Sequence, residues 1–132
     1  MGLQSAYGIS IPAEPERIRE AREFADAAAA AFGFGEDARY EIRLAASEAV
    51  TNAIQHGSSS PDDTIKFSVV EEGRVLHFHV VDHGRFVPRV ESGDPLPARG
   101  RGLGFLAHLM DEVCIGRAEP GTIVRFSKRL DD

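Results

Sequence analysis

The sequence of 132 residues contains one cysteine, Cys114, and no tryptophan. A single cysteine excludes an intrachain disulfide and a zinc site built from several thiolates. No apolar run reaches the roughly 20 residues needed to cross a bilayer, and the N-terminal residues MGLQSAYGIS lack the pattern of a secretory leader. We therefore expect a cytoplasmic protein that makes no use of a membrane.

Basic residues are in the minority, with 15 lysines and arginines against 21 acidic residues and a formal net charge of −6. Because nucleic-acid binding needs an extended basic surface, this balance excludes a direct nucleic-acid partner. A local basic patch could still hold one nucleotide. The length predicts a single domain over residues 1–132, and the 42% hydrophobic content indicates a globular chain.

Apolar residues recur at helical or alternating spacing along most of the chain, which predicts the order β-α-α-β-β-α-β-β. This order indicates an α+β fold, a two-layer sandwich with helices on one face of a mostly antiparallel mixed sheet. Glu72-Gly73 is the expected turn of a hairpin, and residues 83–101 form a long loop of the kind that covers a ligand. The expected strands lie around Tyr7 to Ile11 and at residues 64–71, 74–82, 112–117 and 122–130, and the expected helices at residues 15–31, 37–56 and 102–110.

Three polar residues, Glu48, Asn52 and His56, recur at every fourth position of the second expected helix. At roughly 100° per residue they form a stripe beside the apolar face, where a cleft borders the core. The spacing alone fits a solvated helix flank equally well. The residue types favour a site, because an amide oxygen can bind Mg²⁺, a carboxylate can accept a proton and an imidazole can donate to a phosphate.

Asp82 ends a strand on the same face as Phe78 and Val80, so its carboxylate points into the layer between sheet and helices. A carboxylate in that position requires a donor. The donor is either a group at the strand end or the amino group of a bound purine, and Gly84 just after it permits close approach of a ligand.

Glycines at 100, 102 and 104 lie where the chain runs into the third expected helix. Backbone N–H groups at the start of a helix can bind an anion, and Arg99 and Arg101 favour a phosphate there. A glycine-rich turn is also a common connector, so this motif is specific only in combination with the others.

Together these segments resemble the GHKL superfamily of ATPases and kinases over nearly the whole chain. SEAVTNAIQHG and GLGFLAHLMDEV are similar to segments of the anti-sigma factor serine/threonine kinases of bacterial partner switching. The matching stretches are residues 48–57 (the N-box), 80–84 (the first glycine box), 100–104 (the second) and 121–126 (the last).

The resemblance implies that Glu48 is the general base, that Asn52 binds Mg²⁺ and that Asp82 binds the adenine amino group of ATP. It also implies that the glycines at 102 and 104 belong to the lid and phosphate loop and that Thr122 lies near the adenine. The full set expected to bind the nucleotide is Asn52, His56, Asp82, Gly84, Arg101, Gly102, Leu103, Gly104 and Thr122.

The function implied is a homodimeric protein kinase that phosphorylates a STAS-domain antagonist and binds and silences a sigma factor. One departure favours an alternative. The first glycine box of the family usually reads Asp-x-Gly-x-Gly, whereas here Phe86 takes the place of the second glycine. A non-catalytic ATP-binding switch that regulates a partner by docking is therefore the second hypothesis.

Two other features are expected to be structural. His77 and His79 share one strand face without a third metal ligand, so an exposed or interface face is expected there. Cys114, between Val113 and Ile115, is expected to pack as a small residue.

Overall fold

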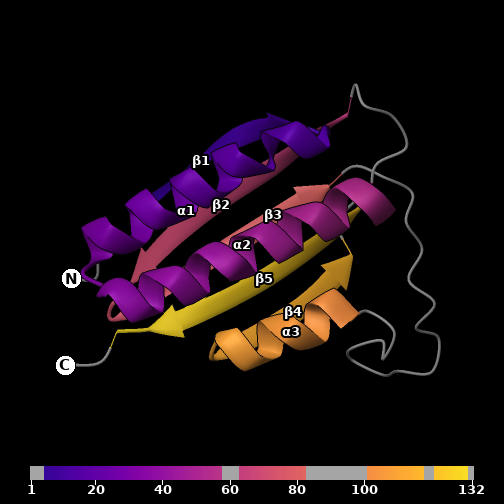
Figure 1. The fold of residues 1–132 in the computed structure, drawn as a ribbon. Coiled ribbons are helices and arrows are strands. Elements are labelled where there is room, and N and C mark those ends of the chain that lie inside the picture. Colours follow the sequence, from indigo (N-terminus) through magenta and orange to yellow (C-terminus); the bar gives the residue numbers. More distant parts are fainter. Residues whose placement is uncertain (1–4, 58–62, 83–100, 118–120, 131–132) are drawn as a thin grey trace.

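The computed structural model describes residues 5–57, 63–82, 101–117 and 121–130. In that part of the chain, helices cover one face of a five-stranded sheet (Figure 1). The elements are β1 (Ser5–Pro12), the short 3-10 helix η1 (Pro15–Arg17), α1 (Ile18–Phe32), α2 (Glu36–Gly57), β2 (Thr64–Glu72), β3 (Val75–Asp82), α3 (Arg101–Leu109), β4 (Glu112–Arg117) and β5 (Thr122–Arg129).

The sheet has the order β1-β2-β3-β5-β4, and each described pairing is antiparallel. The predicted element order and two-layer α+β architecture are confirmed, but the expectation of a mixed sheet is wrong. β3 and β4 run in the same direction, as the connection through α3 requires. They do not pair, because β5 lies between them.

The core is built from alanine-rich helices on a phenylalanine-rich sheet. Phe67, Phe78 and Phe126 form a row across β2, β3 and β5, with ring centroids 5.9 and 5.2 Å apart. Small residues on the helices let the backbones approach these rings closely, and burial of this apolar surface is the main stabilising term. The fully or almost fully buried helix residues include Ala21, Ala25, Ala29, Ile42, Ala45, Ala46, Ala49 and Val50.

Glycines with positive φ mark two of the predicted ends. Gly33 ends α1 at φ 114°, and its N–H donates to the carbonyls of Ala29 and Ala30. The hairpin between β2 and β3 is shifted by one residue from the expected turn. Glu72 pairs with Val75, so the turn is Gly73-Arg74, because Gly73 at φ 61° takes the first loop position.

The face of the sheet away from the helices is called the open face below, and no described helix covers it (Figure 1). Cys114 lies on this face and is exposed, 3.7 Å from Arg125 Nη2, so the expectation that it packs inside is wrong. Its neighbours Val113 and Ile115 point toward the core instead. By strand alternation and register, the open face carries Ala6, Gly8, Ser10, Pro12, Thr64, Lys66, Ser68, Val70, Glu72, Val75, His77, His79, Val81, Glu112, Cys114, Gly116, Ile123, Arg125, Ser127 and Arg129.

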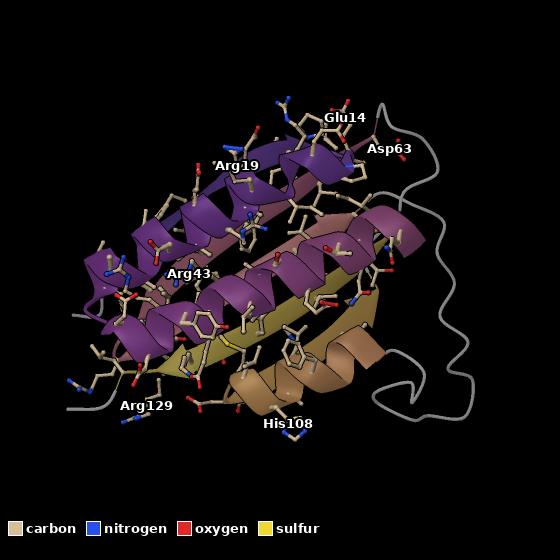
Figure 2. All side chains as sticks on the ribbon, in the orientation of Figure 1. Glu14, Arg19, Arg43, Asp63, His108 and Arg129 are labelled. Atoms are coloured by element: carbon tan, nitrogen blue, oxygen red, sulfur yellow. The ribbon has the colours of Figure 1, made fainter. Side chains whose placement is uncertain are left out.

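One ion-pair network joins the two long helices. Arg39 on α2 donates two hydrogen bonds of 3.0 Å to Asp26 on α1, and Arg43 adds a third of 2.8 Å from its position between the helices (Figure 2). The bidentate geometry is the strongest form of such a pair. The network fixes the angle at which α2 leaves α1.

Asp26→Asn is expected to lower the free energy of unfolding by about 1 kcal/mol at neutral pH. The hydrogen bond from Arg39 is the main cause that holds the pKa of Asp26 below its ordinary value. A carboxyl group whose pKa is lowered by folding stabilises the native state above its unfolded-state pKa and loses that contribution as the pH falls through the folded-state value. Urea unfolding of both proteins should therefore give a difference that shrinks in strongly acidic solution; a constant difference would contradict this role.

Candidate functional site

Four elements meet at one end of the sandwich: the C-terminal half of α2, the end of β3, the start of β5 and the start of α3 (Figure 1). α2 packs on both β3 and α3. Asp82, the last residue of β3, is the register partner of Thr122, the first residue of β5. The fold therefore brings three of the segments singled out in the sequence to one place.

Asp82 is buried, with 5% of its surface exposed, on the helix-facing side that the alternation predicted. Its Oδ1 accepts a hydrogen bond of 3.3 Å from the backbone N–H of Thr122. An ionised carboxylate can accept about four hydrogen bonds, and the N–H of Thr122 is the donor of one of them.

Thr122 is also buried, and its Oγ1 has no hydrogen-bond partner among the described residues. A buried hydroxyl without a partner costs free energy that a bound polar group would recover. Asp82 and Thr122 thus present an acceptor and an unpartnered hydroxyl side by side.

Glu48 and Asn52 lie one turn apart on α2 and are both half-buried, beside the buried face of Ala45, Ala49 and Ala53. Their predicted place at the border of the core is confirmed. The amide Nδ2 of Asn52 is buried and has no hydrogen-bond partner in the described part of the chain. A 180° rotation of the amide would present Oδ1 in the same place, so this side chain suits a phosphate oxygen in one orientation and a cation in the other.

α3 begins at Arg101, which leaves the backbone N–H groups of its first turn without partners inside the helix. Gly104 is exposed, and a methyl group added there would meet no described atom within 4 Å. The start of α3 therefore leaves room for an anion on the Gly104 side.

Several predicted site residues cannot be placed. Gly84 and Phe86 lie outside the described residues, as do the side chains of His56, Arg101, Gly102 and Leu103. In the described part, no three or more histidine, cysteine or acidic side chains are grouped to hold a metal ion. A magnesium ion at Asn52 would therefore need ligands from the nucleotide and water, which is how Mg²⁺ is commonly held.

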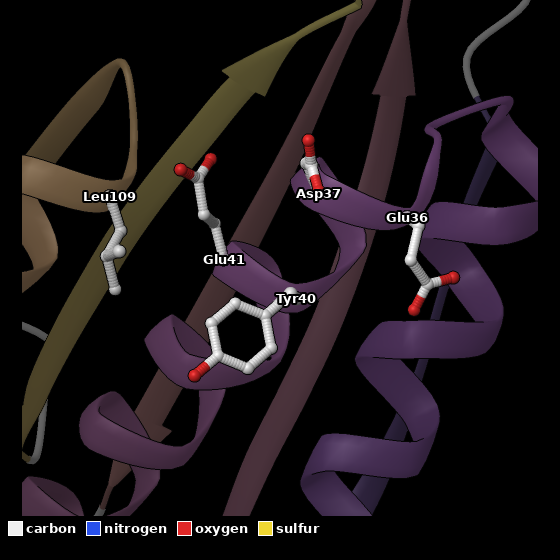
Figure 3. Close-up of a pocket in the computed structure, with 5 residues that line it drawn as sticks. All are labelled: Glu36, Asp37, Tyr40, Glu41 and Leu109. Atoms are coloured by element: carbon white, nitrogen blue, oxygen red, sulfur yellow. The ribbon is translucent and has the colours of Figure 1, made fainter.

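A shallow hollow of 520 Å³ lies near the other end of α2 (Figure 3). It is lined by Glu36, Asp37, Tyr40 and Glu41 of α2 and by Leu109 of α3. Tyr40 precedes Asn52 by roughly 18 Å along the helix axis. Since carboxylates repel phosphates, this hollow is unsuited to a nucleotide.

Sequence reasoning missed the contacts that hold these elements in place. The Asp26 network of α1 and α2 is one, and a contact of Lys128 with Glu41 and Leu109 is another. The only signal for the second was a lysine at a core-facing position of β5, in step with Val124 and Phe126.

No helix in the described part of the chain is both long enough and apolar enough to cross a membrane.

Residues 11–128 match the family described as histidine kinase-like ATPase domain. An anti-sigma F factor of Anoxybacillus flavithermus is 36% identical over 100 aligned residues, which cover 68% of each chain. The serine-protein kinase RsbW of Bacillus velezensis is 29% identical over 137 aligned residues, which cover 93% of this chain and 84% of that protein.

Two solved structures have a similar fold. The structure of the RsbU and RsbW domains of Rv1364c from Mycobacterium tuberculosis superposes with a TM-score of 0.74 at 22% identity, covering 96% of this chain and 32% of that one. The blue-light activated histidine kinase EL346 of Erythrobacter litoralis gives a TM-score of 0.61 at 25% identity, over 92% of this chain and 42% of that one.

The resemblance to the GHKL superfamily, and within it to anti-sigma factor kinases, is thereby confirmed. With a match over residues 11–128 and relatives above 30% identity, the chain belongs to the histidine kinase-like ATPase domain family.

Proposed function

We propose that this protein is a cytoplasmic ATP-dependent serine/threonine protein kinase that also acts as an anti-sigma factor. Its substrate would be a STAS-domain antagonist, and its second partner a sigma factor. The observation that carries the proposal is the convergence of Asp82, Thr122 and Asn52 at the start of α3, with two buried polar atoms that lack a described partner. Relatives called anti-sigma F factor and serine-protein kinase support the same reading.

In this scheme the adenine lies against β3 and β5. Asp82 accepts from the adenine amino group, and the hydroxyl of Thr122 bonds a neighbouring ring nitrogen, which satisfies a buried group. The residues after Asp82, with Gly84, would lie beside the base. This pairing selects adenine over guanine, because guanine presents a carbonyl where adenine presents the amino group.

The phosphates lie between α2 and α3. The first N–H groups of α3, from Arg101 through Gly104, would bind the anion, so Arg101, Gly102 and Leu103 would contribute to the phosphate site as the first turn of the helix. Asn52 and His56 approach the phosphates from α2, with Asn52 Oδ1 as the protein ligand of Mg²⁺. A bound Mg²⁺ neutralises charge on the phosphate oxygens.

Glu48 then serves as the general base, one turn before Asn52 on the same helix. Its carboxylate accepts the proton of the attacking serine hydroxyl as the serine oxygen bonds to the γ-phosphorus and the bond to the β-phosphate oxygen breaks. ADP leaves with the bridging oxygen. Because α2 is anchored to α1 through Asp26, the base is held on a rigid element, which is where a catalytic group is positioned best.

The test of the proposed function is phosphoryl transfer. The full chain is incubated with Mg²⁺, ATP labelled at the γ-phosphate and the STAS-domain protein encoded nearest to it, with a serine-to-alanine antagonist as the control. The expected result is label on the antagonist that the alanine control lacks. If the protein binds ATP but transfers no label, the result favours the non-catalytic switch, which Phe86 in the first glycine box supports. If it binds no nucleotide, the result contradicts both the kinase and the switch.

We also propose that the protein is a homodimer joined through the open face. The charged residues of the open face are Lys66, Glu72, Glu112, Arg125 and Arg129, of which Glu72, Glu112 and Arg129 lie at strand ends. Val70, Val81 and Ile123 are half-buried although no described helix covers them. Burial, followed by the charges of Arg125 and His77, lowers the pKa of His79, so its imidazole is neutral at neutral pH. A sheet face that no described helix covers and that leaves apolar side chains in contact with water is typical of a protein interface.

Val70→Glu is expected to convert the dimer to a monomer at micromolar concentration, because it places a charge between Ala6 and His77 on the open face. Sedimentation velocity measures the change in mass. Tyr40→Glu, an exposed position on the helix side, is the control and should keep the wild-type mass. A Val70→Glu protein that still sediments as a dimer would rule out the open face as the interface.

A further inference from the structure

The C-terminal end of α3 is fixed to β5 by three contacts. The N–H of Asp111 donates to the carbonyl of Ser127 at 2.9 Å, and Asp111 Oδ2 accepts from the N–H of Arg129 at 2.7 Å. The third contact is a 2.8 Å hydrogen bond from Lys128 Nζ to the carbonyl oxygen of Leu109, the last residue of α3.

Lys128 is an unusual residue for its position. It lies on the helix-facing side of β5, in step with buried Val124 and Phe126, and only 14% of its side chain is exposed. Removing an ammonium group from water is costly unless the charge is compensated. Here Glu41 Oε1 of α2 lies 2.9 Å from Nζ, so one cation ties β5 to both α2 and α3.

The geometry points to Lys128 as a positioning residue for the phosphate-binding end of α3, an inference that rests on the proposed function. A cation at a helix C-terminus satisfies free carbonyls and interacts favourably with the helix dipole. α3 has only nine residues, so fixing its last carbonyl also fixes the direction in which its first N–H groups point. Leu106 and Met110 bury one side of the end of the helix, and the contact of Lys128 joins the helix itself to the sheet, whereas those of Asp111 lie just beyond its last residue.

Lys128 therefore acts on phosphate binding through α3, whereas adenine binding depends on Asp82 and Thr122 at the strand ends. Loss of the lysine should weaken ligands that carry phosphates and spare those that do not. A residue that merely stabilised the fold would weaken both kinds of ligand alike. Pre-organisation of the N–H groups is the physical basis, because a freely moving helix must be ordered when the anion binds.

The test compares Lys128→Met with the wild-type full chain by titration calorimetry with ATP, ADP and adenosine. Methionine keeps the apolar stem of the lysine, and Glu41, with 42% of its side chain exposed, stays in contact with water, so the substitution leaves no fully buried unpaired charge. The dissociation constants for ATP and ADP are expected to rise about fivefold, the size of one lost hydrogen bond, with that for adenosine unchanged. Lys128→Arg, which can reach both acceptors, should restore most of the ATP affinity.

Asp26→Asn is the matched control, because it weakens the fold at α1 and α2 without touching α3. It should leave the ratio of the ATP and adenosine constants at the wild-type value. An unchanged ATP constant in Lys128→Met, or an equal loss for ATP and adenosine, would overturn the inference while the proposed function stood. Wild-type protein that binds no ATP would overturn the proposed function as well.

Discussion

Glu48→Gln is expected to bind Mg-ATP with wild-type affinity. Its rate of phosphoryl transfer to the STAS-domain antagonist is expected to fall about a hundredfold or more. The amide keeps the size and most of the polarity of the carboxylate but accepts no proton from the serine hydroxyl. Glu48 is half-buried at the border of the core, so the substitution leaves the packing of α2 unchanged. Single-turnover transfer of labelled phosphate, with ATP binding measured separately, separates the two effects.

The matched control is Glu36→Gln, the same substitution in the first turn of the same helix. Glu36 is exposed and its contacts with Arg39 and Arg43 are long, at 3.9 and 4.0 Å, so its charge contributes little to stability. This variant should transfer phosphate at the wild-type rate. Undiminished transfer by Glu48→Gln would remove Glu48 from the role of base.

Asp82→Asn is expected to weaken ATP binding roughly hundredfold, the loss that accompanies removal of a charged acceptor from a buried hydrogen bond. Asparagine can still accept from the N–H of Thr122 through Oδ1, so β3 and β5 should keep their register. The other end of the amide is a donor, and it would face the amino group of adenine without forming a bond.

A ligand without a base provides the control for that experiment. Inorganic triphosphate carries the phosphates of ATP but makes no contact with Asp82 in the proposed arrangement. Its affinity, measured by the same calorimetry, should be equal in Asp82→Asn and the wild type. A parallel loss for ATP and triphosphate would mean that the substitution disturbs the whole site and that Asp82 does not read the base.

Much of the site could be predicted from local patterns. Asp82 follows Leu76, Phe78 and Val80 at alternate positions, and that spacing alone placed its carboxylate in the buried layer where the structure has it. The position of Asn52 at the edge of the apolar helix face followed equally from the helical period. In both cases the periodicity of a single strand or helix determines whether the side chain lies on its buried side.

Features that depend on how elements meet could not be predicted in this way. Tertiary packing places β5 between β3 and β4. The pairing of Asp82 with Thr122 follows from that placement. The pairing of β4 with β5 places Cys114 opposite exposed Arg125 instead of in the core. The contact of Lys128 joins three elements far apart in the sequence, and strand alternation can show only that a lysine there is unusual.

ATP is expected to bind where α2, β3, β5 and α3 meet, and a titration of the full chain with Mg-ATP, followed by backbone amide NMR, measures this binding residue by residue. The amide signals of Asn52, Asp82, Gly104 and Thr122 should shift with one dissociation constant, while those of Glu36, Asp37 and Tyr40 around the distant hollow should stay in place. Shifts confined to the hollow, or no shifts at millimolar ATP, would contradict this expectation.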